Sequence, residues 1–411
     1  MKNKRIESFD ILRGISLMFI ILLHSAIYNY ANIHQIDFSN PPIIIVLMSF
    51  MALWGGIFIV LSTLVNALMF SRRTKDKKNF KIFSHLSIIG VSYLFLHYIL
   101  NMFLGRWNVD FVNNTPDMTF IANILRNVQS LFPPITKLFE GSSLSTIGLN
   151  LIILSGILFF FYKKKIIKKY LYLGVIGSSI MLLSFVRIFL YGYLTQAIES
   201  HNYLLSTFYS FTLANPYPLL PYLAYGFFGA LIGLMIFDNK RKSLKRIVAP
   251  IGSFFMLYGL SGMMSFEKTI STPDWFWYFK TNFELGAFIL LLIFTFFFLE
   301  NKTKLIGKLS FIKRFSRVSL SVYMLETFLS EIVRLVLNAF YPMWNQTINN
   351  CLLFGGLNIL IWIIILFYWE KVNFKYSLEY FWVKFFGRLG KKSTKMKYLG
   401  SNAGKEETVE E

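Results

Sequence analysis

The chain has 411 residues, of which 55% are hydrophobic and 18% aromatic, whereas only 15% are charged. Because soluble globular proteins carry more charge and fewer apolar side chains, this composition excludes an ordinary soluble domain and indicates a polytopic membrane protein. The formal net charge of +21 would suit a nucleic-acid-binding protein, so the positions of the basic residues decide how the charge is interpreted.

The first apolar run, from Arg5 to His34, is long enough to cross a bilayer and still contains Asp10, Arg13 and His24. Charged or titratable groups are costly in hydrocarbon, so their presence indicates a function or a specific partner. Arg13 and His24 are eleven residues apart, which places them on nearly the same helix face, about 16 Å apart along the axis. The run lacks a small-x-small cleavage site, so we expect a membrane anchor rather than a signal peptide.

Apolar runs near the ~20-residue length of a membrane span recur about ten times, separated by short polar or basic connectors. The expected fold is therefore an all-α polytopic membrane protein, a single bundle of about ten transmembrane helices. The expected spans lie near residues 9–31, 43–70, 84–104, 145–162, 171–194, 217–237, 247–265, 281–299, 317–340 and 351–369.

The basic residues concentrate in alternate connectors. Lys and Arg are abundant at 71–81, 163–169, 239–246, 301–317 and after Trp369. The other connectors hold only Arg106, Arg126, Lys137, Lys268 and Lys280. This asymmetry follows the positive-inside rule and predicts that both termini are cytoplasmic, so the net charge needs no nucleic-acid partner. The single cysteine, Cys351, excludes an internal disulfide framework and a multi-cysteine metal site.

The longer connectors and the tail differ from the spans in composition. Segment 105–144 is semi-polar and could hold short interfacial helices, while 195–216 could dip back toward the bundle. Residues 370–389 mix aromatic and basic side chains, as expected for a helix on the inner membrane surface. Residues 390–411 are polar and favour disorder. The expected domains are therefore a transmembrane domain at 1–369, a cytoplasmic interfacial helix at 370–389 and a disordered cytoplasmic tail.

Ionisable residues recur in the later spans. Under the expected topology Arg187, Glu284, Glu331 and Arg334 lie in the outer third of their spans, and Glu326 lies deeper. Gathered in the bundle interior, they would form a polar cavity that opens to the outside and receives a hydrophilic acceptor. Local pairing of Glu331 with Arg334, three residues apart, is the structural alternative.

Two histidines are candidates for chemistry. His24 lies about two-thirds of the way across the first span, and an imidazole suits proton transfer or transient nucleophilic catalysis. Its structural alternative is an inter-helix hydrogen bond. His34 falls just outside this span, where an ordinary loop histidine is equally expected. Asp10 and Arg13 can pair near the cytoplasmic end, and Arg13 can also hold an anionic ligand that arrives from the cytoplasm.

Three segments together resemble the transmembrane acyltransferase superfamily, which covers the acyltransferase-3 proteins and the relatives of heparan-alpha-glucosaminide N-acetyltransferase. FDILRGISLMFIILLH resembles the first-span signature, with Asp-x-x-Arg-Gly followed by a His eleven residues after the Arg. NPYPLLPYLAYGFFGALIG at 215–233 is similar to a proline-aromatic, glycine-rich span, and FSRVSLSVYMLETFLSEI at 315–332 is similar to a late Gly-Arg-x-Ser-Leu-x-x-Tyr-x-Leu segment. This last segment has Phe-Ser-Arg instead of Gly-Arg, and Glu326 stands where many members carry His.

The resemblance implies transfer of an acyl group, acetyl above all, from cytoplasmic acyl-CoA to a hydroxyl or amine of an extracytoplasmic glycan or related acceptor. The protein would be a multi-pass protein of the cell membrane. In the acyltransferase-3 branch the essential His lies within the first span, where His24 stands, whereas in the N-acetyltransferase branch it lies just beyond, near His34. Both are candidate catalytic residues. Asp10 and Arg13 would face the acetyl-CoA donor. The acceptor would be oriented by Arg187, Glu284, Glu326, Glu331 and Arg334.

Two other interpretations remain open. The same cavity could serve a transporter or exporter of a polar solute or glycan, or the polar residues could only join helices in a non-catalytic protein. The sequence contains no P-loop, no zinc-type spacing and no nucleophile-elbow motif, so ATP hydrolysis and metalloprotease or α/β-hydrolase chemistry are not expected. The expected partners are membrane lipid, acyl-CoA and a polar acceptor, with a homodimer as one option and with neither metal nor nucleic acid.

Overall fold

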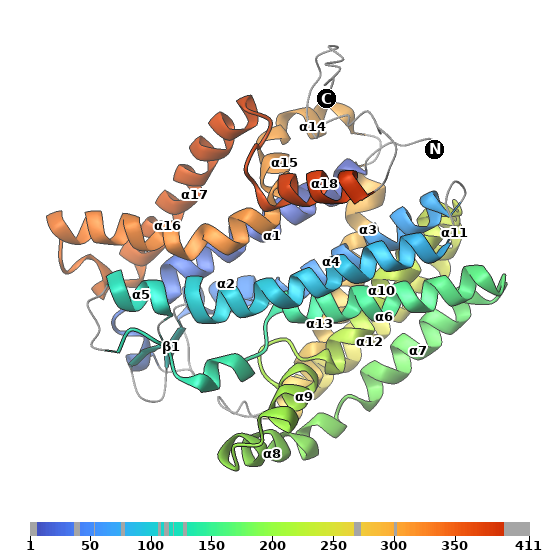
Figure 1. Ribbon diagram of the computed structural model, residues 1–411, viewed down its shortest axis with the longest axis horizontal. Helices are drawn as coiled ribbons and strands as arrows, with labels where there is room; N and C mark the ends of the chain where they lie inside the picture. Colours follow the sequence, from blue (N-terminus) through green and yellow to red (C-terminus); the bar gives the residue numbers. More distant parts are fainter. Residues whose placement is uncertain are drawn as a thin grey trace. The chain divides into compact units, whose positions relative to one another are not determined.

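The computed structural model of the protein is built almost entirely of helices (Figure 1). Its elements form two compact units, which we call the terminal unit and the central unit. The terminal unit draws on Met1–Met51, Arg106–Asp117 and Leu299–Glu411, and the central unit on Ala52–Gly105 and Met118–Phe298. The structure describes residues 6–36, 42–52, 54–74, 79–105, 108–110, 115–117, 119–125, 130–266, 273–299 and 302–389.

The terminal unit contains the first helix of the chain and the last helices of the chain. Its two strands pair antiparallel in a short hairpin. Its elements are α1 Glu7–Ile27, η1 Ile33–Gln35, α2 Ile43–Ala52, β1 Asn108–Asp110, β2 Thr115–Asp117, α14 Thr303–Lys308, α15 Ser310–Arg317, α16 Ser319–Phe340, η5 Trp344–Gln346, α17 Ile348–Lys371 and α18 Leu378–Leu389. Ala52, the last residue of α2, is assigned to the central unit.

Helix α1 is the buried axis of the terminal unit and packs against α15, α16 and α17. Its contact with α15 is close, since a Cβ atom on Gly14 would lie 2.3 Å from the backbone oxygen of Ile312. Only glycine therefore allows this approach. Past its end, α1 is fastened to η5, because the side-chain amide of Asn345 donates to the backbone oxygen of Asn29 at 2.8 Å.

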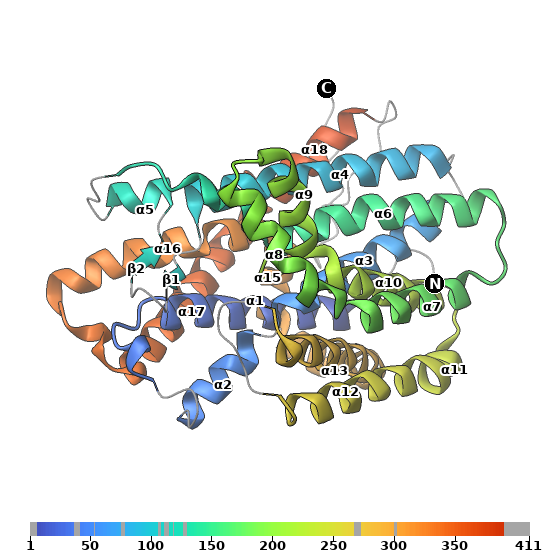
Figure 2. The ribbon, with the colours of Figure 1, turned by 90° about the horizontal axis from the view of Figure 1, so that it is seen from below.

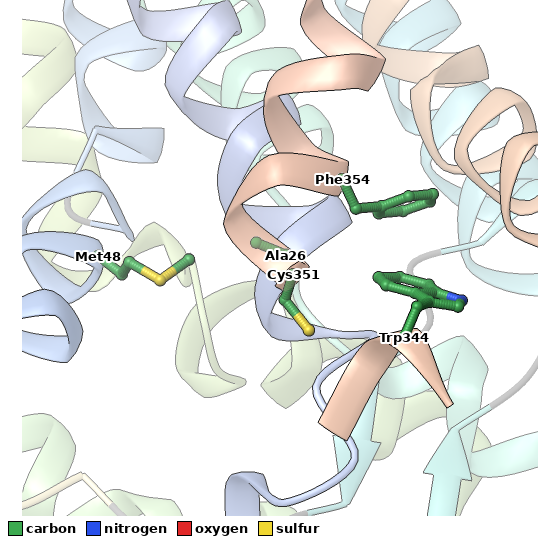
Figure 3. Close-up of a cluster of buried hydrophobic side chains, with 5 residues drawn as sticks. All are labelled: Ala26, Met48, Trp344, Cys351 and Phe354. Atoms are coloured by element: carbon green, nitrogen blue, oxygen red, sulfur yellow. The ribbon is translucent and has the colours of Figure 1, made fainter. Parts of the chain in front are cut away.

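A compact apolar cluster packs around the end of α1 (Figure 3). The rings of Trp344 and Phe354 face each other with their centroids 4.4 Å apart, and Ala26 of α1 and Cys351 of α17 lie beside them. Met48 of α2 completes the cluster. Burial of this apolar surface fixes the C-terminal part of α1, which carries His24, against α17.

The central unit is organised around α10, which is buried along almost its whole length. This helix packs against α3, α6 and α7. A Cβ atom on Gly229 would lie 2.4 Å from the backbone oxygen of Val60, so α10 and α3 are in backbone contact. Helices α12 and α13 run side by side in the same unit (Figure 2). The elements are α3 Gly55–Arg73, α4 Asn79–Ile99, η2 Leu100–Leu104, α5 Phe120–Leu125, η3 Ile135–Phe139, α6 Ser143–Lys163, α7 Lys169–Leu183, α8 Val186–Glu199, α9 Tyr203–Leu213, α10 Leu219–Phe237, α11 Arg241–Ser243, η4 Leu244–Val248, α12 Ala249–Met263 and α13 Trp275–Leu299.

The helices confirm an all-α polytopic membrane protein. Within the described residues, eight helical segments are long and apolar enough to cross a membrane, and a ninth counts if the pair α7 and α8, bent by 65°, forms one span. Helix α16 has the length of a span, but Glu326, Glu331 and Arg334 keep it outside this set. The count of about ten spans, the single bundle, the cytoplasmic placement of both termini and the domain boundaries stay predictions.

Two expected spans have a different local structure. The run 43–70 is divided between α2 and α3, where Gly55 and Gly56 follow Trp54 and lower the helix propensity. The run 171–194 is bent between α7 and α8.

The connector 195–216 contains the helix α9, and the tail 370–389 contains α18. Residues 390–411, for which we expect disorder, lie outside the described residues.

Candidate functional site

The centre of the candidate site is a buried pair between α1 and α16. Nδ1 of His24 lies 2.5 Å from Oε1 of Glu326, and the two residues are 8% and 2% exposed. The imidazole ring also stacks on Tyr28, one turn further along α1, with centroids 5.0 Å apart. In the neutral imidazole whose hydrogen is on Nδ1, a carboxylate at this distance accepts that hydrogen bond and the lone pair is on Nε2.

Several polar atoms in these parts of α1 and α16 have no hydrogen-bond partner among the described residues. Nε2 of His24 makes no hydrogen bond with any residue that the structure describes. Oε2 of Glu326 and the hydroxyls of Ser25 and Ser330 are buried and, within the same part of the chain, also lack a hydrogen-bond partner. Ser330 lies one turn after Glu326 and shares its helix face, whereas Ser25, directly after His24, is on a different side of α1. Buried polar atoms are rarely left unpaired, so they favour a place where a polar ligand supplies the missing bonds.

The first turns of α1 carry Asp10 and Arg13. Asp10 is buried and accepts a hydrogen bond from the Ser316 hydroxyl of α15 at 3.1 Å, while Arg13 is half-buried. The neighbouring helix α15 is held to α17 by Arg314, whose Nε donates to Glu370 at 2.6 Å. The basic residues of α15 next to this end of α1 are paired with carboxylates, Lys313 with Glu7 of α1 and Arg314 with Glu370 of α17.

The other ionisable residues of α16 pair with each other. Nε of Arg334 donates to Oε2 of Glu331 at 2.7 Å, and a second bond joins Nη2 to Oε1. The Glu331 side chain is 1% exposed and that of Arg334 17%. The local pairing that the spacing predicts is therefore present, and it leaves part of the guanidinium accessible. His34 lies in η1, and its side chain lies outside what the structure describes.

In the central unit, Arg187 is fully buried at the first turn of α8, directly after the bend. Its Nε donates to the backbone oxygen of Leu213 at 2.7 Å, and its Nη2 donates to Oδ1 of Asn215 at 2.6 Å. The guanidinium carbon lies 3.9 Å from the ring centroid of Trp277. Such a cation–π contact stabilises a desolvated guanidinium.

Glu284 of α13 is also buried in the central unit. Its carboxylate lies 3.5 Å from Nζ of Lys280 and accepts a hydrogen bond from the Tyr225 hydroxyl at 3.3 Å. The same hydroxyl lies 2.7 Å from the backbone oxygen of Thr281, so Glu284 is held in place between a lysine and a tyrosine.

The predicted residues are therefore divided between the two units. His24 contacts Glu326, and Glu331 contacts Arg334, all within the terminal unit, which also carries Asp10 and Arg13. Arg187 and Glu284 belong to the central unit. A single polar cavity that gathers all of them stays a prediction.

Sequence reasoning missed several partners of these residues. Ser316, Asn215 and Tyr225 are ordinary polar residues whose contacts depend on tertiary packing, so no sequence signal identifies them. The stacking of Trp277 on Arg187 likewise depends on tertiary packing.

Comparison with known proteins gives no family assignment. No protein-family model matches the sequence, and no curated protein matches it. Membership of the transmembrane acyltransferases, which the three segments resemble, therefore stays a proposal.

Proposed function

We propose that the protein is an integral acyltransferase of the cell membrane. It transfers an acyl group, acetyl above all, from cytoplasmic acyl-CoA to a hydroxyl or amine of an extracytoplasmic glycan or related polar acceptor. The observation that carries the proposal is the buried contact between His24 and Glu326, with Nε2 left without a partner among the described residues.

The pair suits a general base. Glu326 accepts the hydrogen on Nδ1 and so fixes the tautomer in which Nε2 carries a lone pair. It also stabilises the imidazolium that forms when Nε2 takes a proton, as the carboxylate of a catalytic triad does. Because both side chains are shielded from water, this electrostatic contribution is larger than it would be in solution.

In the proposed reaction, His24 accepts the proton of the acceptor hydroxyl or amine through Nε2. The acceptor oxygen or nitrogen then forms a bond to the thioester carbonyl carbon, and the carbon–sulfur bond breaks. The leaving thiolate takes the proton from His24, so the enzyme returns to its starting state. A thioester is already activated, so the main contributions of the protein are a base and correct positioning.

The remaining predicted residues have roles in binding. Arg13, with Asp10, faces the donor in this proposal, since both residues lie in the first turns of the helix that carries His24. Glu331 and Arg334, in the same unit as His24, orient the acceptor. A part for Arg187 and Glu284, which belong to the central unit, stays a prediction. The resemblance of the first span to acyltransferase-3 proteins supports His24 as the base, and His34 is the alternative that the N-acetyltransferase branch suggests.

The test is release of free CoA thiol by the purified full chain, incubated with acetyl-CoA and candidate sugars. We expect His24→Asn to lower the rate by about 10²–10⁴-fold, the usual contribution of a general base. His97→Gln is a matched control, since His97 is also buried and contacts Ser142 at 2.7 Å in the central unit. If folded His24→Asn keeps the full rate on an acceptor that the wild type acylates, the assignment of the base is wrong. If His34→Ala loses activity and His24→Asn keeps it, His34 is the catalytic base.

A second candidate function is transport or export of a polar solute. The bend of 65° between α7 and α8, with buried Arg187 at the bend, favours it, because broken helices often form binding sites in transporters. Reconstituted vesicles distinguish the two functions: solute movement without thiol release supports transport, and thiol release that depends on the acceptor supports acyl transfer.

A further inference from the structure

Arg187 carries a buried charge that its surroundings do not neutralise. The side chain is 0% exposed, and it forms no ion pair with a carboxylate in the part of the chain that the structure describes. Its printed acceptors, the backbone oxygen of Leu213 and the amide oxygen of Asn215, are both neutral. A buried charge is costly unless it is paired, so this arrangement needs an explanation.

The guanidinium has donors left over. Nη1 is buried and has no hydrogen-bond partner among the described residues, and Nη2 uses Asn215 alone. A structural arginine that only ties α8 to the segment after α9 would need Nε and Nη2, both of which are occupied. It would not need Nη1. The free donor therefore points to a ligand atom rather than to a purely structural role.

Asn215 occupies the position of a ligand oxygen. Its side-chain amide has the same planar shape as a carboxylate, and its Oδ1 lies 2.6 Å from Nη2. The residue is only half-buried, and the following Pro216 is exposed. A modest movement of this side chain would open Arg187 to a group that approaches from the surface. Trp277, which is also half-buried, covers one face of the guanidinium and leaves its edge for hydrogen bonding.

We propose that Arg187 binds the carboxylate of a ligand through Nη1 and Nη2, in place of the Asn215 side chain. A bidentate carboxylate would satisfy the unpaired donor and neutralise the buried charge in one step. Identification of this ligand with the acyl acceptor, which would then be an acidic sugar such as a uronic acid, rests on the function proposed above. The binding itself does not.

The test compares two substitutions of Asn215 in the purified full chain, without acyl-CoA. The probe is D-glucuronate, with D-glucose at the same ionic strength as the uncharged control, and the readout is the ligand-dependent rise in Tm. Asn215→Asp places a carboxylate of the same shape next to Arg187, so we expect it to raise Tm without ligand and to weaken glucuronate binding about 100-fold or more through intramolecular competition. Asn215→Ala removes the competing amide and is expected to tighten binding by about threefold to tenfold.

Three results would overturn the proposal. One is an equal Tm response of the wild type to glucuronate and glucose. Another is undiminished glucuronate binding by Asn215→Asp. The third is a lower Tm of unliganded Asn215→Asp, which would show that the site rejects a carboxylate. None of these measurements involves acyl transfer, so failure of the binding proposal is distinguishable from failure of the catalytic proposal.

Discussion

The substitution Glu326→Gln tests the partner of His24 while it preserves the shape of the side chain. Oε1 of Glu326 lies 2.5 Å from Nδ1 of His24, and Glu326 is 2% exposed. A hydrogen bond to a charged group contributes about 1.5–3 kcal/mol and a neutral one about 0.5–1.5 kcal/mol. The amide therefore forfeits about 1–1.5 kcal/mol of stabilisation of the imidazolium, which corresponds to about tenfold in rate.

The loss is larger if the amide nitrogen, rather than its oxygen, faces Nδ1. The ring would then hold its hydrogen on Nε2, the wrong tautomer for a base, and in a catalytic triad this error costs about 10⁴-fold in kcat. We therefore expect Glu326→Gln to lower kcat by about 10- to 10⁴-fold with KM nearly unchanged, because Glu326 acts through His24. Glu326→Asp keeps the charge and should recover part of the rate.

The assay is thiol release from acetyl-CoA at saturating acceptor, with folding checked by the Tm of each variant. Glu370→Gln is the control, since Glu370 joins α15 to α17 through Arg314 and Arg317 and lies outside the proposed chemistry. It should lower stability and keep kcat. If folded Glu326→Gln has the kcat of the wild type, Glu326 does not position the base and the reasoning from the pair fails.

Two further predictions concern stability. Gly14→Ala should lower the free energy of unfolding by about 1–3 kcal/mol through overpacking against Ile312. The control is Gly356→Ala, whose Cβ would meet nothing within 4 Å and which should raise the free energy of unfolding by about 0.5–1 kcal/mol. Equal effects of the two substitutions in denaturant unfolding would contradict the close contact of α1 with α15. Burial raises the pKa of the Glu379 carboxyl, although hydrogen bonds from Ser321 partly oppose the rise. Stability should therefore fall as pH rises from the ordinary glutamate pKa through the raised one, because the folded state holds the proton longer. Glu379→Gln should remove this fall, which thermal unfolding across a pH series measures.

The sequence predicted the helical spans well because their signal is local. Apolar runs such as those of α1, α10 and α17 are long enough that hydropathy alone identifies them. It did not predict the division between α2 and α3, although Gly55 and Gly56 lower the helix propensity there, or the bend before Arg187. Nor did the hydropathy of α16 reveal that its two buried glutamates are paired separately, Glu326 with His24 and Glu331 with Arg334.

The candidate site was predicted in part. The unusual His24 within an apolar helix was visible because an ionisable group in a span is rare. Its partner was assigned to acceptor binding, since 302 residues separate His24 from Glu326 in the chain and no local periodicity connects them. The same limit applies to Arg187, whose neighbours Asn215 and Trp277 come from distant elements.

The strongest competing explanation of the pair is that it only joins α1 to α16. A purely structural contact in a membrane gains most when every polar atom is satisfied, because each unpaired one lowers the stability. Here α1 is already held by backbone contact at Gly14 and by the apolar cluster around Cys351, so the pair is not needed to fasten it. Oε2 of Glu326 has no hydrogen-bond partner among the described residues, so the polar atoms of this contact between the two helices are not all satisfied. The unpaired oxygen of Glu326 and the separate fastening of α1 therefore favour the proposed chemistry over a purely structural contact.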